Sequence, residues 1–457
     1  MQKNSKNDFS EGSIWKTVLA LAIPMSMAQL VQVCYSIIDR IYIGHLQSTS
    51  SLALTGLGLT FPVITIISAF TNLFSTGGVP LFSIARGKQN HKQADIIMGN
   101  TFSLLLVSSI LITIIFMLVM KPLLYLFGAS DVTYPYAREY MTIYLLGTVF
   151  SMTGSGMNGF INSQGFGKTG MMTVLFGAIM NVILDPIFIF AFGLGIRGAA
   201  IATVISQAFS ALWVLHFLHS PKSLYHIHFS AMRLYAKTVR EISALGLAGF
   251  FMGVTNGVVQ IACNTMLHSY GGDLYVGIMT VLNSIRDIVQ LPISGLGTAA
   301  QPVMGYNYGA HKYDRVKQTI HFATVLCIIY MISAWVLVMK FATPIISVFT
   351  SDPTMISLGR TAIRIYFSGF FISSLQYSGQ AVFVGLGQSK FAAVFSLFRK
   401  VGIVIPLTLI LPVVGMGVNG VLLAEPISNV VSSILCFITM LVHTRKLLKP
   451  ESESLAA

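Results

Sequence analysis

Long apolar stretches alternate with short polar segments along the whole chain of 457 residues. A helix needs about 20 predominantly apolar residues to cross the hydrocarbon core of a bilayer. Twelve stretches come near or exceed that length: 17–44, 52–85, 94–119, 137–163, 170–193, 197–219, 239–268, 274–305, 316–341, 355–386, 391–412 and 417–443. The pattern predicts an all-α integral membrane protein with twelve transmembrane helices, several of them long enough to cross at a tilt.

Basic residues fall in the polar segments and alternate between the two sides of the predicted membrane. If the N-terminus is cytoplasmic, eighteen Lys and Arg residues lie in cytoplasmic segments, and the outer loops hold Lys121, Arg197 and Lys340. Cytoplasmic loops of membrane proteins carry such an excess of basic residues. We therefore expect a multi-pass protein of a bacterial-type plasma membrane with both termini in the cytoplasm.

Composition and charge exclude several functional classes. The chain is 54% hydrophobic and 9% charged, whereas soluble domains carry roughly 25% charged residues. The net charge of +13 is spread over short loops, so we expect the lipid bilayer and no nucleic acid as a partner. The sequence has no P-loop, no metal-ligand spacing among its four cysteines, and no nucleophile next to a base. We expect neither an enzyme nor a direct ATP-driven pump, and no cofactor.

The chain repeats itself at an offset of about 222 residues. Pro80 then falls on Pro302, and Gly87 falls on Gly309. Six predicted helices separate the halves, so both halves have the same orientation, as in parallel transporter repeats. We predict an N-terminal lobe at 1–218, a cytoplasmic linker with some amphipathic helical character at 219–238, a C-terminal lobe at 239–445 and a cytoplasmic tail at 446–457. A binding site is expected between or within the lobes, near mid-depth.

Acidic residues within predicted helices are costly in lipid and are candidates for function. The N-terminal half contains two of them, and each lies in the outer half of its helix. An amide and a hydroxyl are expected to converge with them, which gives four candidate residues: Asp39, Asn181, Asp185 and Thr203. Their oxygens suit a hard cation such as Na⁺. They equally suit a proton, because burial favours the neutral form of a carboxyl group. A purely structural Asp pair is the competing interpretation.

Two prolines weaken helices near this predicted site. Pro186 leaves the carbonyl of Val182 without its helical partner. Pro24 interrupts the first helix fifteen residues before Asp39, so this helix has a candidate hinge, although a static kink explains Pro24 equally well. Further polar side chains in the first and fourth helices are candidate cleft residues: Gln32, Tyr35, Asn158 and Asn162.

The C-terminal half lacks the paired acids. Thr203 aligns with Glu425, which predicts a lone inward-facing acid in this half. Arg399 and Lys400 are its candidate neighbours, and a structural ion pair competes there with a substrate or proton role. Arg286 is followed by Asp287, so it either pairs locally or faces the central cavity.

Several segments together resemble the multidrug and toxic compound extrusion (MATE) family of the MOP flippase superfamily. In the first half they are ALAIPMSMAQLVQVCYSIIDRIYIGHL, SIARGKQNHKQAD, NSQGFGKTG, NVILDPIFIF and GIRGAAIAT. In the second half they are RDIVQLPISGLGTAAQPVMGYNYGAHKYDRV, FVGLGQSKF and GMGVNGVLLAEPIS. The resemblance covers essentially the whole chain.

The resemblance implies two lobes that form a V, and export of organic cations in exchange for inward H⁺ or Na⁺. Within the family, the chain resembles the DinF-like branch. The cation-site positions of that branch match Asp39, Asn181, Asp185 and Thr203. Cleft positions match Gln32, Tyr35, Asn158 and Asn162, and the helix-1 proline matches Pro24. We expect a monomeric antiporter of small amphipathic organic cations. A flippase of lipid-linked oligosaccharides or lipids, as in other members of the superfamily, is the alternative.

Overall fold

The computed structural model describes residues 8–44, 50–127, 129–349 and 352–448. Within these ranges the side chains at 36–37, 39–41, 43–44, 50–55, 229, 252 and 273 lie outside the description. The predicted residue Asp39 is one of them: its backbone belongs to the first helix, and its side chain is not described. Every element in the described ranges is a helix.

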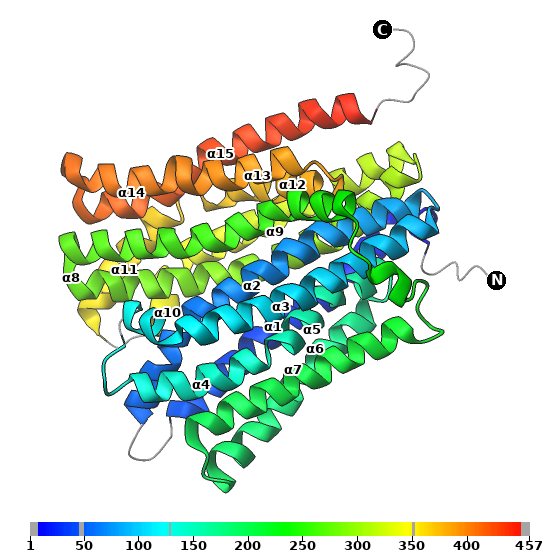
Figure 1. Ribbon diagram of the computed structural model, residues 1–457. Coiled ribbons are helices and arrows are strands. Elements are labelled where there is room, and N and C mark those ends of the chain that lie inside the picture. Colours follow the sequence, from blue (N-terminus) through cyan, green and yellow to red (C-terminus); the bar gives the residue numbers. More distant parts are fainter. Residues whose placement is uncertain (1–7, 45–49, 128, 350–351, 449–457) are drawn as a thin grey trace.

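The N-terminal half is built from seven α-helices and a short π-helical segment (Figure 1). They are α1 (Ile14–Gly44), α2 (Ser50–Gly87), α3 (His91–Leu126), α4 (Tyr134–Leu146), α5 (Thr148–Ser163), α6 (Gly167–Pro186), η2 (Ile187–Ala191) and α7 (Gly195–His219).

The C-terminal half begins after a linker that contains the short 3₁₀ turn η3 (Phe229–Met232). Its first helix, α8, is the longest element and holds two of the predicted crossings. The helical segments are α8 (Ala236–Gly309), α9 (Tyr313–Lys340), α10 (Ala342–Ser347), α11 (Pro353–Tyr366), η4 (Phe370–Ile372), α12 (Ser373–Gly385), α13 (Ser389–Leu397), η5 (Phe398–Val404), α14 (Ile405–Leu411), η6 (Pro412–Met416) and α15 (Gly417–Leu447).

Nine segments of the described chain are long and apolar enough to cross a membrane. The predicted crossings 137–163 and 355–386 are each divided into shorter helices, at Gly147 and at residues 367–372, so neither reaches that length. The segment Ser389–Leu447 contains two predicted crossings, which meet at Gly415 and Gly417 with φ of 99° and 51°. The count of twelve crossings therefore stays a prediction, while the all-helical, multi-pass membrane architecture is confirmed.

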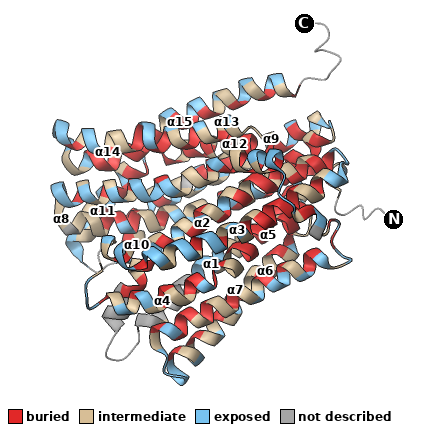
Figure 2. Cartoon of the chain, in the orientation of Figure 1, coloured by how far each residue is buried: buried red, intermediate tan, exposed pale blue. Residues whose placement is uncertain are grey.

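The outer surface carries large apolar side chains, as a lipid environment requires. On α3, Ile110, Ile114 and Leu118 are all exposed, Leu118 to 79%. Buried positions lie on the faces that the helices turn toward one another (Figure 2). Side chains are thus buried where helices contact one another, and the exposed apolar faces are suited to contact the acyl chains of lipids.

Two separate hydrophobic cores lie in the molecule, and they do not coincide fully with the predicted lobes. The first half of α1, including Val18 and Leu21, packs into the core formed by the C-terminal helices. Ile242 of α8 packs into the core formed by the N-terminal helices. The predicted boundaries at 218 and 239 describe the order of the chain. In the packing, the first half of α1 belongs to the C-terminal core, and the start of α8 contacts the N-terminal core.

The 222-residue repeat reappears as a symmetrical contact between the halves. A side chain on Gly87 of α2 would collide with the backbone of Tyr306 and Ala310, and one on Gly309 of α8 would collide with the backbone of Ile84 and Lys88. The repeat offset of 222 places Ile84 on Tyr306, Gly87 on Gly309 and Lys88 on Ala310, so it exchanges the two contacts. The halves therefore meet here about a pseudo-two-fold axis, as expected of a parallel repeat.

Both ends of the described chain lie at the same end of the molecule as this glycine contact. The amide of Asn307 donates to the carbonyl of Phe9 at 3.0 Å. At the other terminus, His443 of α15 is hydrogen-bonded to Gln388, and neighbouring Gly387 lies beside Ile84. Figure 1 shows the chain ends at one side of the bundle. That arrangement fits termini on one side of the membrane.

Arg86 strengthens the contact between the halves at this closed end. Its Nη1 donates to the carbonyl of Ser163 at 2.6 Å. Its guanidinium lies over the rings of Phe9 and Tyr306, 5.0 and 4.8 Å from their centroids. Such cation–π contacts gain strength when they are desolvated, and Arg86 is buried. One cation thus joins α2 and α5 to α8 and to the segment that precedes α1.

The linker packs against the N-terminal half and does not form the expected amphipathic helix. Between α7 and α8, the described residues contain only the 3₁₀ turn η3. Asn100 of α3 donates to the carbonyls of Ala231 and Arg233 and accepts from the amide of Tyr235. The side chain of Gln164 accepts from the amides of Leu224 and Tyr225. These side chains replace the hydrogen bonds that a helix would have made within itself.

The close packing of α2 on α8 gives a direct test of the closed end. A side chain at Gly246 would collide with the carbonyl of Leu73, whereas Gly257, on the same helix, has no atom within 4 Å of the corresponding position. We expect Gly246→Ala to destabilise the protein by about 1–3 kcal/mol, because the two backbones must separate. Thermal unfolding in detergent measures the loss. Gly257→Ala is the control, and equal midpoints for the two variants would contradict this packing.

Candidate functional site

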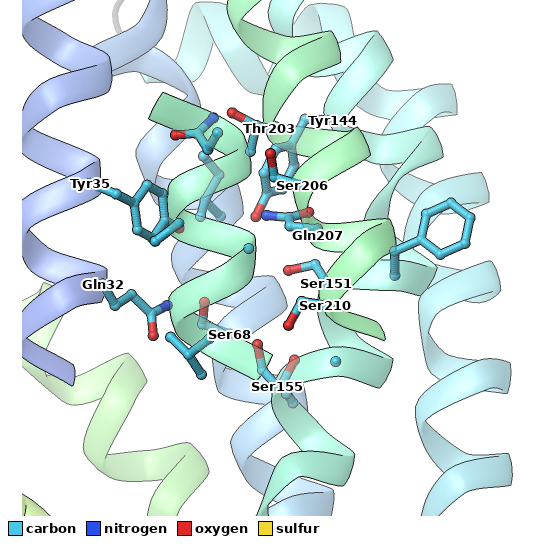
Figure 3. Close-up of a pocket in the computed structure, with 18 of the residues that line it drawn as sticks. Gln32, Tyr35, Ser68, Tyr144, Ser151, Ser155, Thr203, Ser206, Gln207 and Ser210 are labelled. Carbon is cyan, nitrogen blue, oxygen red and sulfur yellow. The ribbon is translucent and has the colours of Figure 1, made fainter. Parts of the chain in front are cut away.

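A cavity of about 380 Å³ lies inside the N-terminal half. It is enclosed by α1, α2, α4, α5, α6 and α7, about midway along α2 and α7. Figure 3 shows Gln32 and Tyr35 projecting from α1 toward hydroxyl and amide side chains of the other helices. Both residues were predicted as cleft residues, and both line this cavity.

Uncharged polar side chains from three helices make up much of the cavity wall. On α7 they recur at the spacing of one helical face. The polar lining residues of α2, α5 and α7 are Ser68, Thr71, Asn72, Ser151, Ser155, Thr203, Ser206, Gln207 and Ser210. The hydroxyls of Thr71 and Ser206 donate to carbonyls of their own helices, at 3.0 and 2.7 Å. Their oxygens therefore remain available as acceptors toward the cavity.

The predicted carboxylate of α6 lies beside this wall. Asp185 is fully buried, and Nδ2 of Asn181 donates to its Oδ1 at 3.1 Å. The pair is four residues apart, on the same helix face as predicted. Asn181 also lines the cavity, so it connects the carboxylate to the open space.

Pro186 follows the carboxylate and marks a change in helix type. α6 ends at this proline and continues as the π-helical segment η2. A proline donates no backbone hydrogen bond, and π-turns are often found at functional sites. The wider turn thus begins directly after Asp185 and Pro186.

Two further oxygens converge on this region without hydrogen-bond partners among the described residues. They are Oδ1 of Asn181 and Oγ1 of Thr203, both on buried side chains that line the cavity. The described residues include no group of three His, Cys, Asp or Glu side chains able to hold a metal ion. A hard cation here would therefore rely on amide and hydroxyl oxygens together with Asp185. Three of the four predicted cation-site residues lie in this region, and the side chain of Asp39 lies outside the description.

The remaining N-terminal predictions have mixed outcomes. Asn158 and Asn162 are not part of the cavity lining. Nδ2 of Asn158 donates to Gly170 and Thr173 on α6, and Nδ2 of Asn162 donates to Asn158. The bonds of Asn158 join α5 to α6, whereas the bond of Asn162 lies within α5, and the cleft role of both residues stays a prediction. Pro24 lies within the continuous helix α1, and its role as a hinge stays a prediction.

The lone acid of the C-terminal half lies against the two cations predicted for it. Oε1 of Glu425 is 2.7 Å from Nη2 of Arg399 and 3.4 Å from Nζ of Lys400. Nη2 of Arg399 also donates to Asn429 at 2.7 Å. The π-helical segment η5 carries both cations at consecutive positions, and both are buried. The ion pair that was one of the two sequence-based alternatives is therefore present, and a substrate or proton role stays a prediction.

Arg286 pairs locally, as one of the two sequence-based alternatives expects, and it also lines a cavity of the C-terminal half; its exposure to a central cavity stays a prediction. Its Nη2 is 3.0 Å from Asp287, and its Nη1 donates to the hydroxyl of Tyr366 at 3.2 Å. It lines a cavity of about 130 Å³ in the C-terminal half, together with the basic residues of η5 and Glu425. This cavity is separate from the one in the N-terminal half.

The comparisons with known proteins agree on one family. A family model described as MatE matches residues 24–187 and 250–410. "Multidrug export protein MepA" of Staphylococcus haemolyticus is 25% identical over 430 residues, which cover 93% of each chain. The protein of the same name from Staphylococcus saprophyticus is 22% identical over 406 residues, or 88% of each chain.

Solved structures give the same fold. "Crystal structure of MATE in the bent conformation" aligns over 100% of both chains with a TM-score of 0.92 and 22% identity. "Outward-facing conformation of a multidrug resistance MATE family transporter of the MOP superfamily" aligns over 98% of this chain and 100% of that one, with a TM-score of 0.90 and 23% identity. At these identities the structural likeness concerns the fold, and it confirms the predicted architecture.

Proposed function

Since this chain belongs to the MatE family of membrane efflux transporters, we propose that it exports amphipathic, mostly cationic compounds in exchange for H⁺ or Na⁺. The observation that carries the proposal is the cavity of about 380 Å³ whose wall includes Asn181, the hydrogen-bond partner of buried Asp185. The multidrug export proteins from Staphylococcus, which align over about nine-tenths of their length, support the export of varied drugs.

The cavity suits an amphipathic organic cation. Its volume falls within the range of about 300–1,000 Å³ that is usual for small-molecule sites. Apolar side chains such as Ile64, Phe150 and Val174 alternate in its wall with hydroxyls and amides. A positively charged ligand finds oxygen acceptors there and no basic lining residue. The apolar surface then accommodates the rest of a varied molecule.

The coupling ion and the exported compound would use adjoining parts of one region. Asp185 is buried, and its hydrogen-bond partner Asn181 lines the cavity, as does Thr203. A cation captured by the oxygens of these residues changes the charge next to the cavity, and so it weakens the binding of a second cation. Such a ligand shifts the conformational equilibrium only if it binds the two states with different affinity.

The direction of transport follows from the sidedness predicted by the basic loops. The glycine contact and Arg86 close the end of the molecule that carries both described chain ends, and that end is predicted to be cytoplasmic. A conformation closed on the cytoplasmic side is one from which an exporter can release its compound to the outside.

Dye efflux from proteoliposomes with an imposed pH or Na⁺ gradient tests the proposal. We expect a cationic dye to move against its own gradient under at least one of the two, and the effective gradient identifies the ion. Efflux that ignores both gradients would contradict cation coupling. Movement of lipid-linked sugars without dye transport would favour the flippase alternative.

A further inference from the structure

The charges around the C-terminal cavity do not balance. Three basic side chains line it: Arg286, Arg399 and Lys400. Of the two acids in the lining, Glu425 is buried, whereas the side chain of Asp287 is 67% exposed. Asp287 pairs with Arg286, so the buried carboxylate of Glu425 faces the two cations of η5, and the lining keeps one positive charge in excess. The lining of the N-terminal cavity contains no charged residue.

Several donors of these cations remain available to a ligand. Nε of Arg399 is buried and has no hydrogen-bond partner among the described residues, although the side chain lines the cavity. The ammonium of Lys400 has three donor hydrogens, and its hydrogen bond to Glu425 is long, at 3.4 Å. An additional acceptor with negative charge would satisfy both groups. Buried polar groups are rarely left unpaired in native proteins.

We propose that the cavity lined by Arg286, Arg399 and Lys400 binds an oxyanion, a carboxylate or phosphate group carried by an amphipathic molecule. The volume of about 130 Å³ is roughly ten times the space that one water requires, so it admits such a group. Guanidinium groups bind carboxylates and phosphates through paired, charge-assisted hydrogen bonds. A cationic ligand is excluded from this cavity because it would meet the surplus positive charge.

The cavity has exposed residues in its lining. Two of them, Asn256 and Asp287, lie on α8. A ligand can therefore reach the cavity from the surface of the C-terminal half along α8. The site lies outside the N-terminal cavity and extends the range of ligands to compounds that carry a negative charge.

A matched pair of dyes tests the site on the purified, full-length protein. Rhodamine 110 carries a free carboxylate, and rhodamine 123 is its methyl ester. We expect Lys400→Met and Arg286→Gln each to weaken rhodamine 110 binding by roughly tenfold, because a charge-assisted hydrogen bond is lost. Rhodamine 123 binding should stay within twofold of the unmodified protein. Fluorescence polarisation in a non-ionic detergent measures both affinities.

Lys317→Met is the matched control, because Lys317 also lies 3.4 Å from a carboxylate, Asp314, but on an exposed surface. It should change neither affinity. Unchanged rhodamine 123 binding shows that a variant is folded, and it keeps this test separate from the proposed export of cations. Equal losses for both dyes, or no loss for rhodamine 110, would overturn the proposal.

A lipid arm identifies the source of the oxyanion. The same titration is repeated with added phosphatidylglycerol, and with phosphatidylcholine as the zwitterionic comparison. Competition by phosphatidylglycerol that disappears in Lys400→Met assigns the site to an anionic lipid headgroup. Absence of competition assigns it to the carboxylate of a transported compound. Both results of the lipid competition are compatible with an oxyanion site. The proposal itself is overturned only by the dye titration.

Discussion

Replacing Asp185 with Asn is expected to reduce gradient-driven dye efflux to the leak rate of protein-free vesicles. Asparagine keeps the shape of the side chain and an oxygen that accepts from Nδ2 of Asn181, now 3.1 Å from Asp185. It removes the charge that would attract a cation or bind a proton. Without differential cation binding, the gradient has no means of shifting the conformational equilibrium. Efflux from proteoliposomes under the effective gradient measures the loss.

Asp287→Asn is the matched control for this experiment. Asp287 is the same residue type, also lies in an apolar helix, and is exposed rather than buried. Its replacement should leave gradient-driven efflux of a cationic dye within about twofold of the unmodified protein, since exposed pairs contribute little. Equilibrium dye binding should persist in both variants. If Asp185→Asn transports at the unmodified rate under both a pH and a Na⁺ gradient, Asp185 is not the coupling residue.

Replacing Glu425 with Gln is expected to destabilise the protein by about 3–5 kcal/mol, the usual cost of removing one partner of a buried ion pair. Arg399 and Lys400 would both remain buried without the carboxylate that lies 2.7 and 3.4 Å from them. The side chain of Glu425 is only 6% exposed, so water cannot replace the lost charge. Thermal unfolding in a non-ionic detergent measures the shift in midpoint.

Glu139→Gln is the control, because Glu139 forms an ion pair of the same length on the exposed surface. Glu139 lies 2.7 Å from Arg197, but the two side chains are 33% and 58% exposed. Exposed ion pairs contribute about 0–1 kcal/mol, because solvent and salt screen them. The midpoint should therefore move little in this variant. Equal shifts for Glu139→Gln and Glu425→Gln would show that the buried cluster is not what stabilises the C-terminal half.

The sequence was sufficient for the architecture because hydrophobic length and loop charge act directly on membrane insertion. The helical breaks were harder to predict. Gly147 and residues 367–372 divide two stretches whose hydropathy predicts continuous apolar helices. Hydropathy measures side-chain polarity and carries no information on the backbone conformation that ends a helix. The exchange of the first half of α1 into the C-terminal core was also not predictable. The internal repeat is a similarity between two stretches of sequence, and such a similarity does not determine which helices are in contact.

The charged residues of the site were found from the sequence, together with Gln32, Tyr35, Asn181 and Thr203 of the cavity wall, while the other hydroxyls and amides of α2, α5 and α7 were missed. Glu425 was paired with Arg399 and Lys400 because an acid in an apolar helix demands a partner. The polar face of α7 has a comparable signal, since Thr203, Gln207 and Ser210 recur within two turns. Asn158 donates to α6, and sequence alone cannot separate such a residue from a ligand-binding one, because amides join helices in membranes as readily as they bind ligands.

The most direct test of the central claim is to record ion movement and dye movement together in one vesicle preparation. Proteoliposomes loaded with a cationic dye and a pH indicator, in buffers with and without ²²Na⁺, report both fluxes. Dye leaving the lumen should draw H⁺ or Na⁺ inward in a fixed ratio, and Asp185→Asn should abolish both fluxes. Dye efflux with neither ion moving, or ion entry that is independent of the dye, would contradict exchange transport.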